Sequence, residues 1–230
     1  MRVLGIDPSP ATRALHLAAR PAGTPKDSDF DMRERAAAPL EDGQFRTAVK
    51  FLSIDPAMRV WMSEAKSYWP PVPLGDVMRA QGIGEITESK NPKFPVGQWV
   101  TAMTGVQDEY IGDGKGAHAF EARRLPHPGW ALSVFGATGM TAYFGLTDIG
   151  QAKAGEVLVV SAAAGAVGSS AVQIGKALGM KTVVGIAGGP EKCAFVKDEL
   201  GADACIDYKN EDVGKKLREL CPDGIDVYFD

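Results

Sequence analysis

The feature that most constrains the fold of this chain is a regular alternation of apolar runs and amphipathic segments in its last third. Gly155–Ala162 is a continuous apolar run, as expected of a strand that is buried on both faces of a sheet. After it, apolar residues recur at steps of four, three and four, at Val167, Ala171, Ile174 and Leu178. That spacing places them on one face and predicts an amphipathic helix.

The same alternation continues to Asp230. Gly179 can end the first helix, and Pro190 and Gly201 suit the first turn and the end of a second helix. The further strands and helices are expected, in alternation, at residues 181–188, 190–201, 202–208, 211–222 and 224–230. Strands that alternate with helices form right-handed βαβ units, so the sequence predicts a parallel sheet covered by helices.

The first half of the chain follows a different pattern, of short segments in which apolar residues nearly alternate with polar ones. Three such segments are Gln44–Ile54, Gln81–Ser89 and Gly97–Met103, and clusters of proline and glycine separate them. Short strands with this punctuation are typical of a barrel or a sandwich. We therefore predict an α/β chain of two domains, with a β-rich domain over residues 1–129 and a doubly wound parallel sheet over residues 130–230.

Composition and charge exclude several classes of protein. A net charge of −4 without a concentrated basic segment argues against a nucleic-acid partner. No segment has the apolar length of a membrane-spanning helix, and the first residues lack the apolar core of a signal peptide. The three cysteines, Cys193, Cys205 and Cys221, match no zinc-binding spacing, and their odd number disfavours a disulfide framework. We therefore expect a cytoplasmic protein with reduced thiols, no metal site and no membrane partner.

Between the first apolar run and its helix lies a cluster of small residues with the spacing Ala163-x-Gly165-x-x-Gly168. This is the dinucleotide-binding fingerprint with alanine in place of the first glycine. Small residues there allow a tight turn, close approach of backbone to a pyrophosphate, and close packing of helix on strand. The helix N-terminus adds unpaired N–H groups and partial positive charge. A glycine-rich turn without a ligand is the alternative, but the position between a buried strand and an amphipathic helix favours a phosphate site.

The residues after the second predicted strand discriminate between the two nicotinamide cofactors. An NAD site carries an Asp or Glu there, which binds the ribose 2′-hydroxyl, whereas Ile186–Gly189 offers no carboxylate. Lys192 can supply a cation to a 2′-phosphate, and Tyr208, at the end of the third predicted strand, can donate its hydroxyl to the same group. A solvated lysine without a ligand is the alternative for Lys192. The sequence therefore predicts NADP(H) as the cofactor.

Several motifs along the chain are similar to those of one protein family. They are LSIDPAMR (52–59), SYWPPVPLGDVMRAQGIGEI (67–86), GMTAYFGL (139–146), AAAGAVGS (162–169), GIAGGPEKC (185–193), IDYK (206–209) and GIDVYFD (224–230). The chain resembles the zinc-independent medium-chain dehydrogenases/reductases, and within them the prostaglandin reductases and the NADPH-dependent alkenal and curcumin double-bond reductases. The resemblance implies a GroES-like β-barrel domain followed by a Rossmann domain, with NADP(H) bound and no metal needed.

The resemblance also implies roles for individual residues. Positions that match the family's contacts to NADP are Met140, Thr141, Gly165, Ala166, Val167, Gly168, Lys192 and Tyr208. Among these, Met140 and Thr141 correspond to the nicotinamide end and Gly165–Gly168 to the pyrophosphate. Tyr68 matches a tyrosine that lines the substrate site, where its hydroxyl contacts the substrate carbonyl. A tyrosine that merely lies beside a proline-rich loop is the alternative for Tyr68.

The implied reaction is the conjugate reduction of an α,β-unsaturated aldehyde or ketone. NADPH gives a hydride to the β-carbon, the enolate is protonated at the α-carbon, and the protein orients the reactants and stabilises the oxyanion. A quinone reductase and a zinc-free alcohol dehydrogenase share the scaffold and stay open as alternatives. A non-catalytic NADPH-binding remnant is a third alternative, because the chain stops after its fourth predicted parallel strand.

Two departures from the family pattern bear on these expectations. Ala57 stands where the family usually carries a tyrosine, which weakens any inference about substrate preference. The sequence ends at Asp230, so strands five and six of a complete Rossmann domain and the segment that returns to the first domain are absent from it. The resemblance implies a homodimer that acts on a small-molecule enone or enal.

Overall fold

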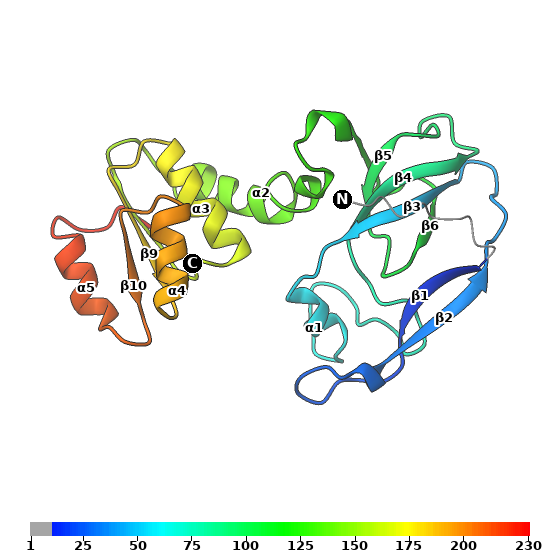
Figure 1. The fold of residues 1–230 in the computed structure, drawn as a ribbon, viewed down its shortest axis with the longest axis horizontal. Coiled ribbons are helices and arrows are strands. Elements are labelled where there is room, and N and C mark those ends of the chain that lie inside the picture. Colours follow the sequence, from blue (N-terminus) through cyan, green and yellow to red (C-terminus); the bar gives the residue numbers. More distant parts are fainter. Residues whose placement is uncertain (1–10) are drawn as a thin grey trace. The chain divides into compact units, whose positions relative to one another are not determined.

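The computed structural model describes residues 11–230, which divide into two compact units (Figure 1). The first unit ends at Leu132, and the second runs over Ser133–Asp230. This division lies close to residue 129, where the sequence analysis ends the first domain, in a segment rich in proline and glycine. Each unit has a hydrophobic core of its own.

The first unit consists mainly of antiparallel strands. Its elements are β1 (Ala11–Leu17), η1 (Asp27–Asp29), β2 (Phe30–Ala36), β3 (Phe45–Leu52), α1 (Ala57–Trp61), β4 (Gly82–Ser89), β5 (Trp99–Ala102), β6 (Glu109–Gly112), β7 (His118–Phe120), η2 (Ala122–Arg124) and η3 (Pro128–Leu132). A five-stranded sheet has the order β6-β3-β4-β5-β7, and β1 pairs with β2 in a separate hairpin. The three predicted strands are β3, β4 and β5, so the expectation of a β-rich first half is confirmed.

Close contact between β3 and β4 shapes this sheet. A Cβ atom added to Gly84 would overlap the carbonyl oxygen of Ala48, so glycine is required where the two strands approach. Register shifts at Arg46/Thr47 and at Val49/Phe51 interrupt the pairing of the two strands. Such irregularities bend a strand and increase its local twist.

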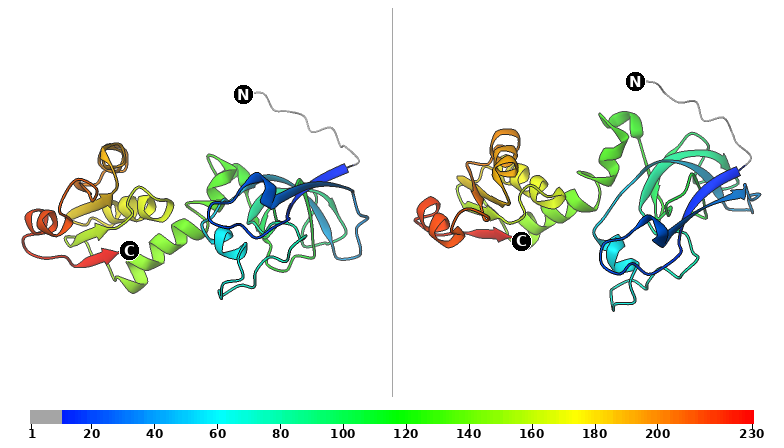
Figure 2. Two further views of the ribbon diagram at one scale, coloured as in Figure 1. Left: turned by 90° about the horizontal axis from the view of Figure 1, so that it is seen from below. Right: turned by 60° about the horizontal axis from the view of Figure 1, so that its bottom comes forward.

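The second unit is a parallel α/β structure (Figure 2). Its elements are α2 (Ala137–Phe144), η4 (Gly145–Ile149), β8 (Val157–Val160), α3 (Ala166–Ala177), β9 (Thr182–Ala187), α4 (Pro190–Ala194), η5 (Phe195–Glu199), β10 (Ala204–Asp207), α5 (Val213–Leu220) and β11 (Val227–Phe229). The four strands pair in parallel in the order β10-β9-β8-β11. Taken along the chain this is the order 3-2-1-4, as in the first four strands of a Rossmann sheet.

The packing of this unit follows the predicted apolar pattern. Leu158, Val160 and Val183 of the central strands are fully buried, and α3 buries Ala171 and Val172 against them. Gly179, which follows α3, has φ +77°, a left-handed conformation that favours glycine and ends the helix. The predicted fold class, with a Rossmann sheet after a β-rich domain, is therefore confirmed.

One predicted helix differs in detail. Residues 190–201 do not form a single α-helix, because α4 passes at Phe195 into η5, a π-helical turn. The Leu200 N–H donates to the carbonyl of Phe195 at 3.2 Å, five residues back, which widens this turn. Pro190 occupies the first turn, as the sequence predicts.

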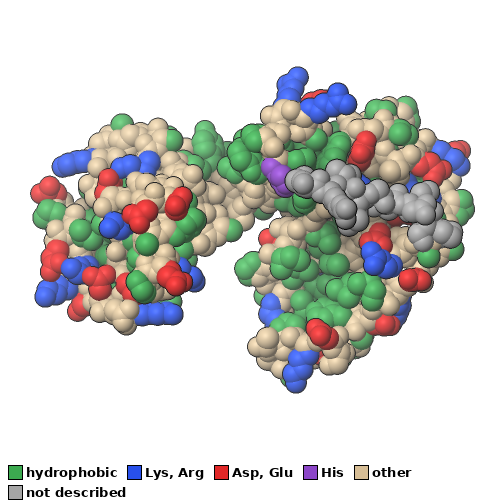
Figure 3. Space-filling model, in the orientation of Figure 1, with side chains coloured by type: hydrophobic (Ala, Val, Ile, Leu, Met, Phe, Trp, Pro, Cys, Tyr) green, Lys and Arg blue, Asp and Glu red, His purple; other side chains and the backbone are tan. Residues whose placement is uncertain are grey.

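Charged side chains of both signs are interspersed over the visible face of the second unit (Figure 3). Mixed charge of this kind differs from the concentrated basic surface of a nucleic-acid-binding domain. Within residues 11–230, no helix combines the length and the apolar character needed to cross a membrane.

Candidate functional site

A tight backbone turn follows β8 and leads into α3. Ala162 has φ +45°, an uncommon left-handed conformation for a residue with a side chain. Its carbonyl accepts a hydrogen bond from the Gly165 N–H at 2.7 Å, which closes the turn. Gly165 is the N-cap of α3, and the N–H groups of Ala166, Val167 and Gly168 form its first turn. These N–H groups have no acceptor within the helix, so the turn presents donors to an anion.

The small residues of the fingerprint bring α3 close to this turn. A Cβ atom on Gly168 would overlap the Ala162 carbonyl oxygen and lie 2.9 Å from the Cα atom of Ala163. Ala163 is fully buried, and its N–H donates to the carbonyl of Ile186 at 3.0 Å. The left-handed turn residue is therefore Ala162, one position before the alanine that replaces the first glycine of the fingerprint. Ala163 contributes close packing between β8 and β9.

The carboxyl ends of β9 and β10 lie at the same edge of the sheet as this turn, because all four strands are parallel. Lys192 projects from α4 as an exposed residue, and it makes no ion pair within residues 11–230. Tyr208 follows β10, and its side chain lies against the backbone of Gly188, where an added Cβ atom would be 2.7 Å from the tyrosine hydroxyl. Tyr208 is 57% exposed, so its hydroxyl is open to a ligand. Ligands of open α/β sheets bind at this edge.

Asp207, the last residue of β10, is a site residue that the sequence analysis misses. Its carboxylate accepts hydrogen bonds from the Gly189 N–H at 2.7 Å, the Lys209 N–H at 3.1 Å and the Asn210 side-chain amide at 2.7 Å. The Gly189 bond, followed by the Asn210 bond, holds the pKa of Asp207 below its ordinary value. The signal in the sequence is an acidic residue at the end of a buried strand, directly before Tyr208.

Two thiols lie beneath the same edge. The Sγ atoms of Cys193, on α4, and Cys205, on β10, are 3.1 Å apart. Burial, together with the hydrogen bond to Cys193, raises the pKa of Cys205 to about 12. Both cysteines are free, and they pack against each other between β10 and α4, the helix that carries Lys192.

The residues predicted at the nicotinamide end lie on α2, which packs against α3 in the same unit. Met140 is 49% exposed and Thr141 is exposed, so both side chains are accessible. Gly139 beside them is buried, and an added Cβ atom there would overlap the carbonyl of Val134. This contact fixes the start of α2 relative to the chain before it.

Tyr68 lies in the first unit, in the loop after α1, and is 78% exposed. It makes no hydrogen bond within the described part of the chain. Its neighbour Trp69 stacks on Trp61 with ring centroids 5.7 Å apart, and the Arg79 guanidinium lies 5.0 Å from the Trp69 ring. This aromatic and cationic cluster holds the loop in place, while the phenol of Tyr68 is exposed.

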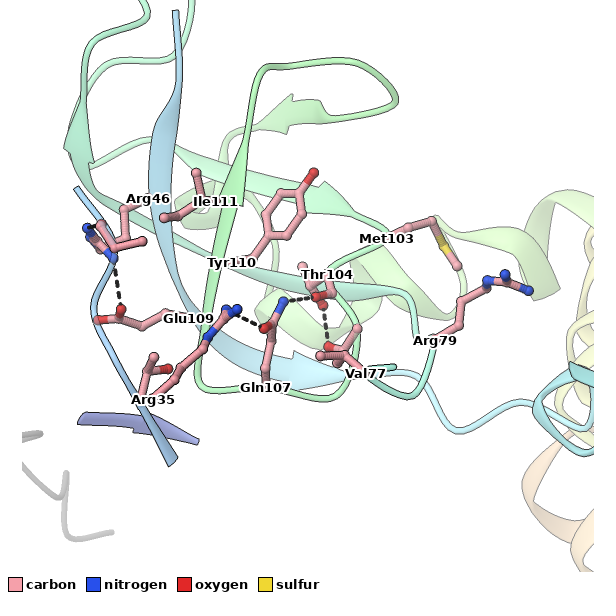
Figure 4. A pocket seen from close by; sticks show the side chains of 13 residues that line it. Arg35, Arg46, Val77, Arg79, Met103, Thr104, Gln107, Glu109, Tyr110 and Ile111 are labelled. Atoms are coloured by element: carbon pink, nitrogen blue, oxygen red, sulfur yellow. Dashed lines mark hydrogen bonds and ion pairs between the residues drawn. The ribbon is translucent and has the colours of Figure 1, made fainter. Parts of the chain in front are cut away.

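The first unit also contains a cavity of about 430 Å³ (Figure 4). At one side of it Arg46 donates to Glu109 at 3.0 Å, and the side chain of Arg35 donates to Gln107 at 2.8 Å. Arg46 and Glu109 thus bind each other, and none of the predicted site residues lines the cavity. Residues 11–230 contain no group of three or more His, Cys, Asp or Glu side chains that could hold a metal ion.

Comparison of the sequence with known proteins identifies related families and proteins. A family model described as the N-terminal domain of oxidoreductase matches residues 13–120, and one described as zinc-binding dehydrogenase matches residues 166–230. The NADPH-dependent curcumin reductase of Escherichia coli is 42% identical over 219 residues, which are 93% of this chain and 61% of that protein. The chain belongs to the medium-chain dehydrogenase/reductase family. Prostaglandin reductase 1 of Rattus norvegicus is likewise 42% identical, over 90% of this chain and 61% of that protein.

A solved structure extends this comparison. The crystal structure of CurA from Vibrio vulnificus in complex with NADPH superposes with a TM-score of 0.85 at 46% sequence identity. The match covers 95% of this chain and 64% of that one. This medium-chain dehydrogenase/reductase chain therefore spans about three fifths of the length of the curated relatives it matches.

Proposed function

We propose that this chain binds NADP(H) at the carboxyl edge of its parallel sheet. The observation that carries the proposal is the combination of a backbone cradle at α3 with an acid-free loop that is flanked by Lys192 and Tyr208. The cradle fits a pyrophosphate, because its N–H groups are free and its glycines leave room for backbone contact. The relatives that are 42% identical include a reductase named for its dependence on NADPH.

In this assignment the site residues divide into three groups. Gly165, Ala166, Val167 and Gly168 bind the pyrophosphate through their backbone, with Ala163 packed beneath them. Lys192 and Tyr208 bind the 2′-phosphate through a cation and a hydroxyl. Met140 and Thr141 lie toward the nicotinamide end on α2.

We further propose that the protein reduces the carbon–carbon double bond of an α,β-unsaturated aldehyde or ketone. When bound, NADPH supplies a hydride to the substrate β-carbon, and no metal ion takes part. Tyr68 donates a hydrogen bond to the substrate carbonyl, which stabilises the enolate oxygen as negative charge develops there. The curated relatives named for curcumin and prostaglandin reduction support this class of reaction.

The test is NADPH oxidation by the purified chain in the presence of an alkenal, a quinone and a saturated ketone, with the products identified by mass spectrometry. The proposal predicts turnover of the alkenal to the saturated aldehyde. Turnover of the quinone or the ketone alone would instead identify a quinone reductase or an alcohol dehydrogenase. Tight binding of NADPH without turnover of any acceptor would identify a non-catalytic NADPH-binding protein.

We also propose that the protein acts in the cytoplasm as a homodimer. The three free cysteines support a reducing compartment. Cell fractionation and light scattering of the purified chain test the location and the assembly separately. A monomer at all concentrations would refute the dimer without affecting the cofactor assignment.

A further inference from the structure

A buried acid at the end of β10 has no part in the cofactor contacts assigned above. Asp207 is only 8% exposed and is the one buried charged side chain in residues 133–230. No ion pair within the described chain neutralises it, and its charge is instead stabilised by N–H donors. A buried carboxylate is costly unless such bonds satisfy it, so the arrangement around it is closely specified.

The three donors come from the loop that precedes the helix of Lys192 and from the loop that begins at Tyr208. The Gly189 N–H belongs to the loop after β9, directly before Pro190 and the helix that holds Lys192. The Lys209 N–H and the Asn210 amide belong to the loop after β10, which begins at Tyr208. One side chain therefore joins the ends of two neighbouring strands.

The backbone around Asp207 reinforces this connection. Its own N–H donates to the Glu211 carboxylate at 2.9 Å, and its carbonyl accepts from the N–H groups of Asn210 and Glu211. Gly189 has φ +101°, so the loop after β9 adopts a conformation that few other residues would hold. The Cys193 N–H then donates to the Gly189 carbonyl at 3.1 Å. The position of Gly189 thus determines where α4 begins and where Lys192 projects.

We propose that Asp207 is a positioning residue that fixes Lys192 and Tyr208 around the 2′-phosphate and thereby sets the preference of this chain for NADPH over NADH. Its carboxylate does not approach the phosphate as a free anion, because all its bonds go to the two loops. The inference rests on the proposed function, since it concerns the same site. It adds a residue that acts through the two ligands and contacts no cofactor atom.

The experiment measures dissociation constants of NADPH and NADH for the 230-residue chain by fluorescence titration and calorimetry. The quantity compared is the ratio of the NADPH affinity to the NADH affinity. In Asp207→Ala this ratio is expected to fall about tenfold, which corresponds to the loss of one charge-assisted hydrogen bond. In Asp207→Asn the amide oxygen still accepts from Gly189, so the ratio is expected to stay within about threefold of wild type.

Asp203, at the opposite end of β10, provides the matched control. Its carboxylate also accepts a backbone N–H, from Val183 at 2.7 Å, and it pairs with Lys176 at 2.8 Å. Asp203→Ala therefore removes a comparable set of bonds at the other edge of the sheet, and it is expected to leave the NADPH to NADH ratio unchanged. If Asp207 had a purely structural role, Asp207→Ala would also leave the NADPH to NADH ratio unchanged, as Asp203→Ala does.

The outcomes separate the two proposals. If the wild-type chain does not bind NADPH, the proposed function fails. If it prefers NADPH and Asp207→Ala keeps the wild-type ratio, only the positioning role is overturned. If circular dichroism shows that Asp207→Ala is unfolded, Asn210→Ala replaces it, because this variant removes a single donor to the carboxylate. A smaller drop in the same ratio is expected there, and an unchanged ratio overturns the proposal.

Discussion

Gly168→Ala is expected to lower the free energy of unfolding of the second unit by about 1–2 kcal/mol. The added Cβ atom overlaps the Ala162 carbonyl oxygen and lies 2.9 Å from the Cα atom of Ala163. These atoms belong to the backbone, so α3 must move away from the turn after β8. Overpacking of this kind costs about 1–3 kcal/mol, and the better helix propensity of alanine returns up to about 1 kcal/mol.

Gly214→Ala is the matched control, because it makes the same substitution in the first turn of α5. The nearest atoms to its added Cβ would be side-chain atoms of Asp212 at 3.5 Å and Arg218 at 3.7 Å, which is ordinary contact. This variant is expected to stabilise the unit by about 0.4–1 kcal/mol, through alanine's helix propensity and a less flexible unfolded chain.

Urea unfolding followed by far-ultraviolet circular dichroism measures both effects, since α2, α3, α4 and α5 all lie in the second unit. All four tryptophans, which are Trp61, Trp69, Trp99 and Trp130, lie in the first unit, so their fluorescence reports that unit instead. The packing argument would be refuted if the helical signal of Gly168→Ala had its unfolding midpoint at the same urea concentration as wild type, or at a higher one. The same movement of α3 is expected to weaken NADPH binding in Gly168→Ala and not in Gly214→Ala.

Three further predictions concern the edge of the sheet. Gly188→Ala places a Cβ atom 2.7 Å from the Tyr208 hydroxyl, so it should displace the ring and weaken NADPH more than NADH in a binding titration. Cys205, with its pKa raised to about 12, should remain a thiol and react slowly with iodoacetamide at pH 8, as followed by mass spectrometry; rapid labelling would contradict this. Because the pKa of Asp207 is lowered on folding, its stabilisation is present above the ordinary aspartate pKa of about 3.9 and is lost as pH falls through the folded value. The difference in unfolding free energy between wild type and Asp207→Asn should therefore be constant at neutral pH and shrink only in acid.

The parallel sheet is predictable from the sequence because its signals are local. A continuous apolar run marks each central strand, and glycine or proline marks the ends of α3 and α4. The β1–β2 hairpin gives no such signal. Its second strand, Phe30–Ala36, is exposed along most of its length and is rich in charged residues, so it lacks the alternation that identifies a half-buried strand.

The site is predictable only in part for a related reason. Gly165, Gly168 and Lys192 stand out because residue type and spacing alone suggest their roles. The left-handed conformation of Ala162 and the bonds of Asp207 depend on where distant backbone groups lie, such as the Gly189 N–H, which is 18 residues away. The π-helical turn after α4 depends on the Leu200 N–H reaching the Phe195 carbonyl five residues back, which helix propensity does not predict. Tertiary contacts of this kind leave no periodic pattern in a sequence.

The central claim is that Lys192 binds the 2′-phosphate of NADP(H), and titration of the wild-type chain and Lys192→Ala with NADPH and NADH tests it most directly. Lys197→Ala, which removes another exposed lysine from the same helical segment, controls for general loss of charge. The account predicts that wild type prefers NADPH, that Lys192→Ala loses about tenfold of its NADPH affinity with little change for NADH, and that Lys197→Ala behaves as wild type. Equal loss of affinity for both cofactors in Lys192→Ala would contradict it.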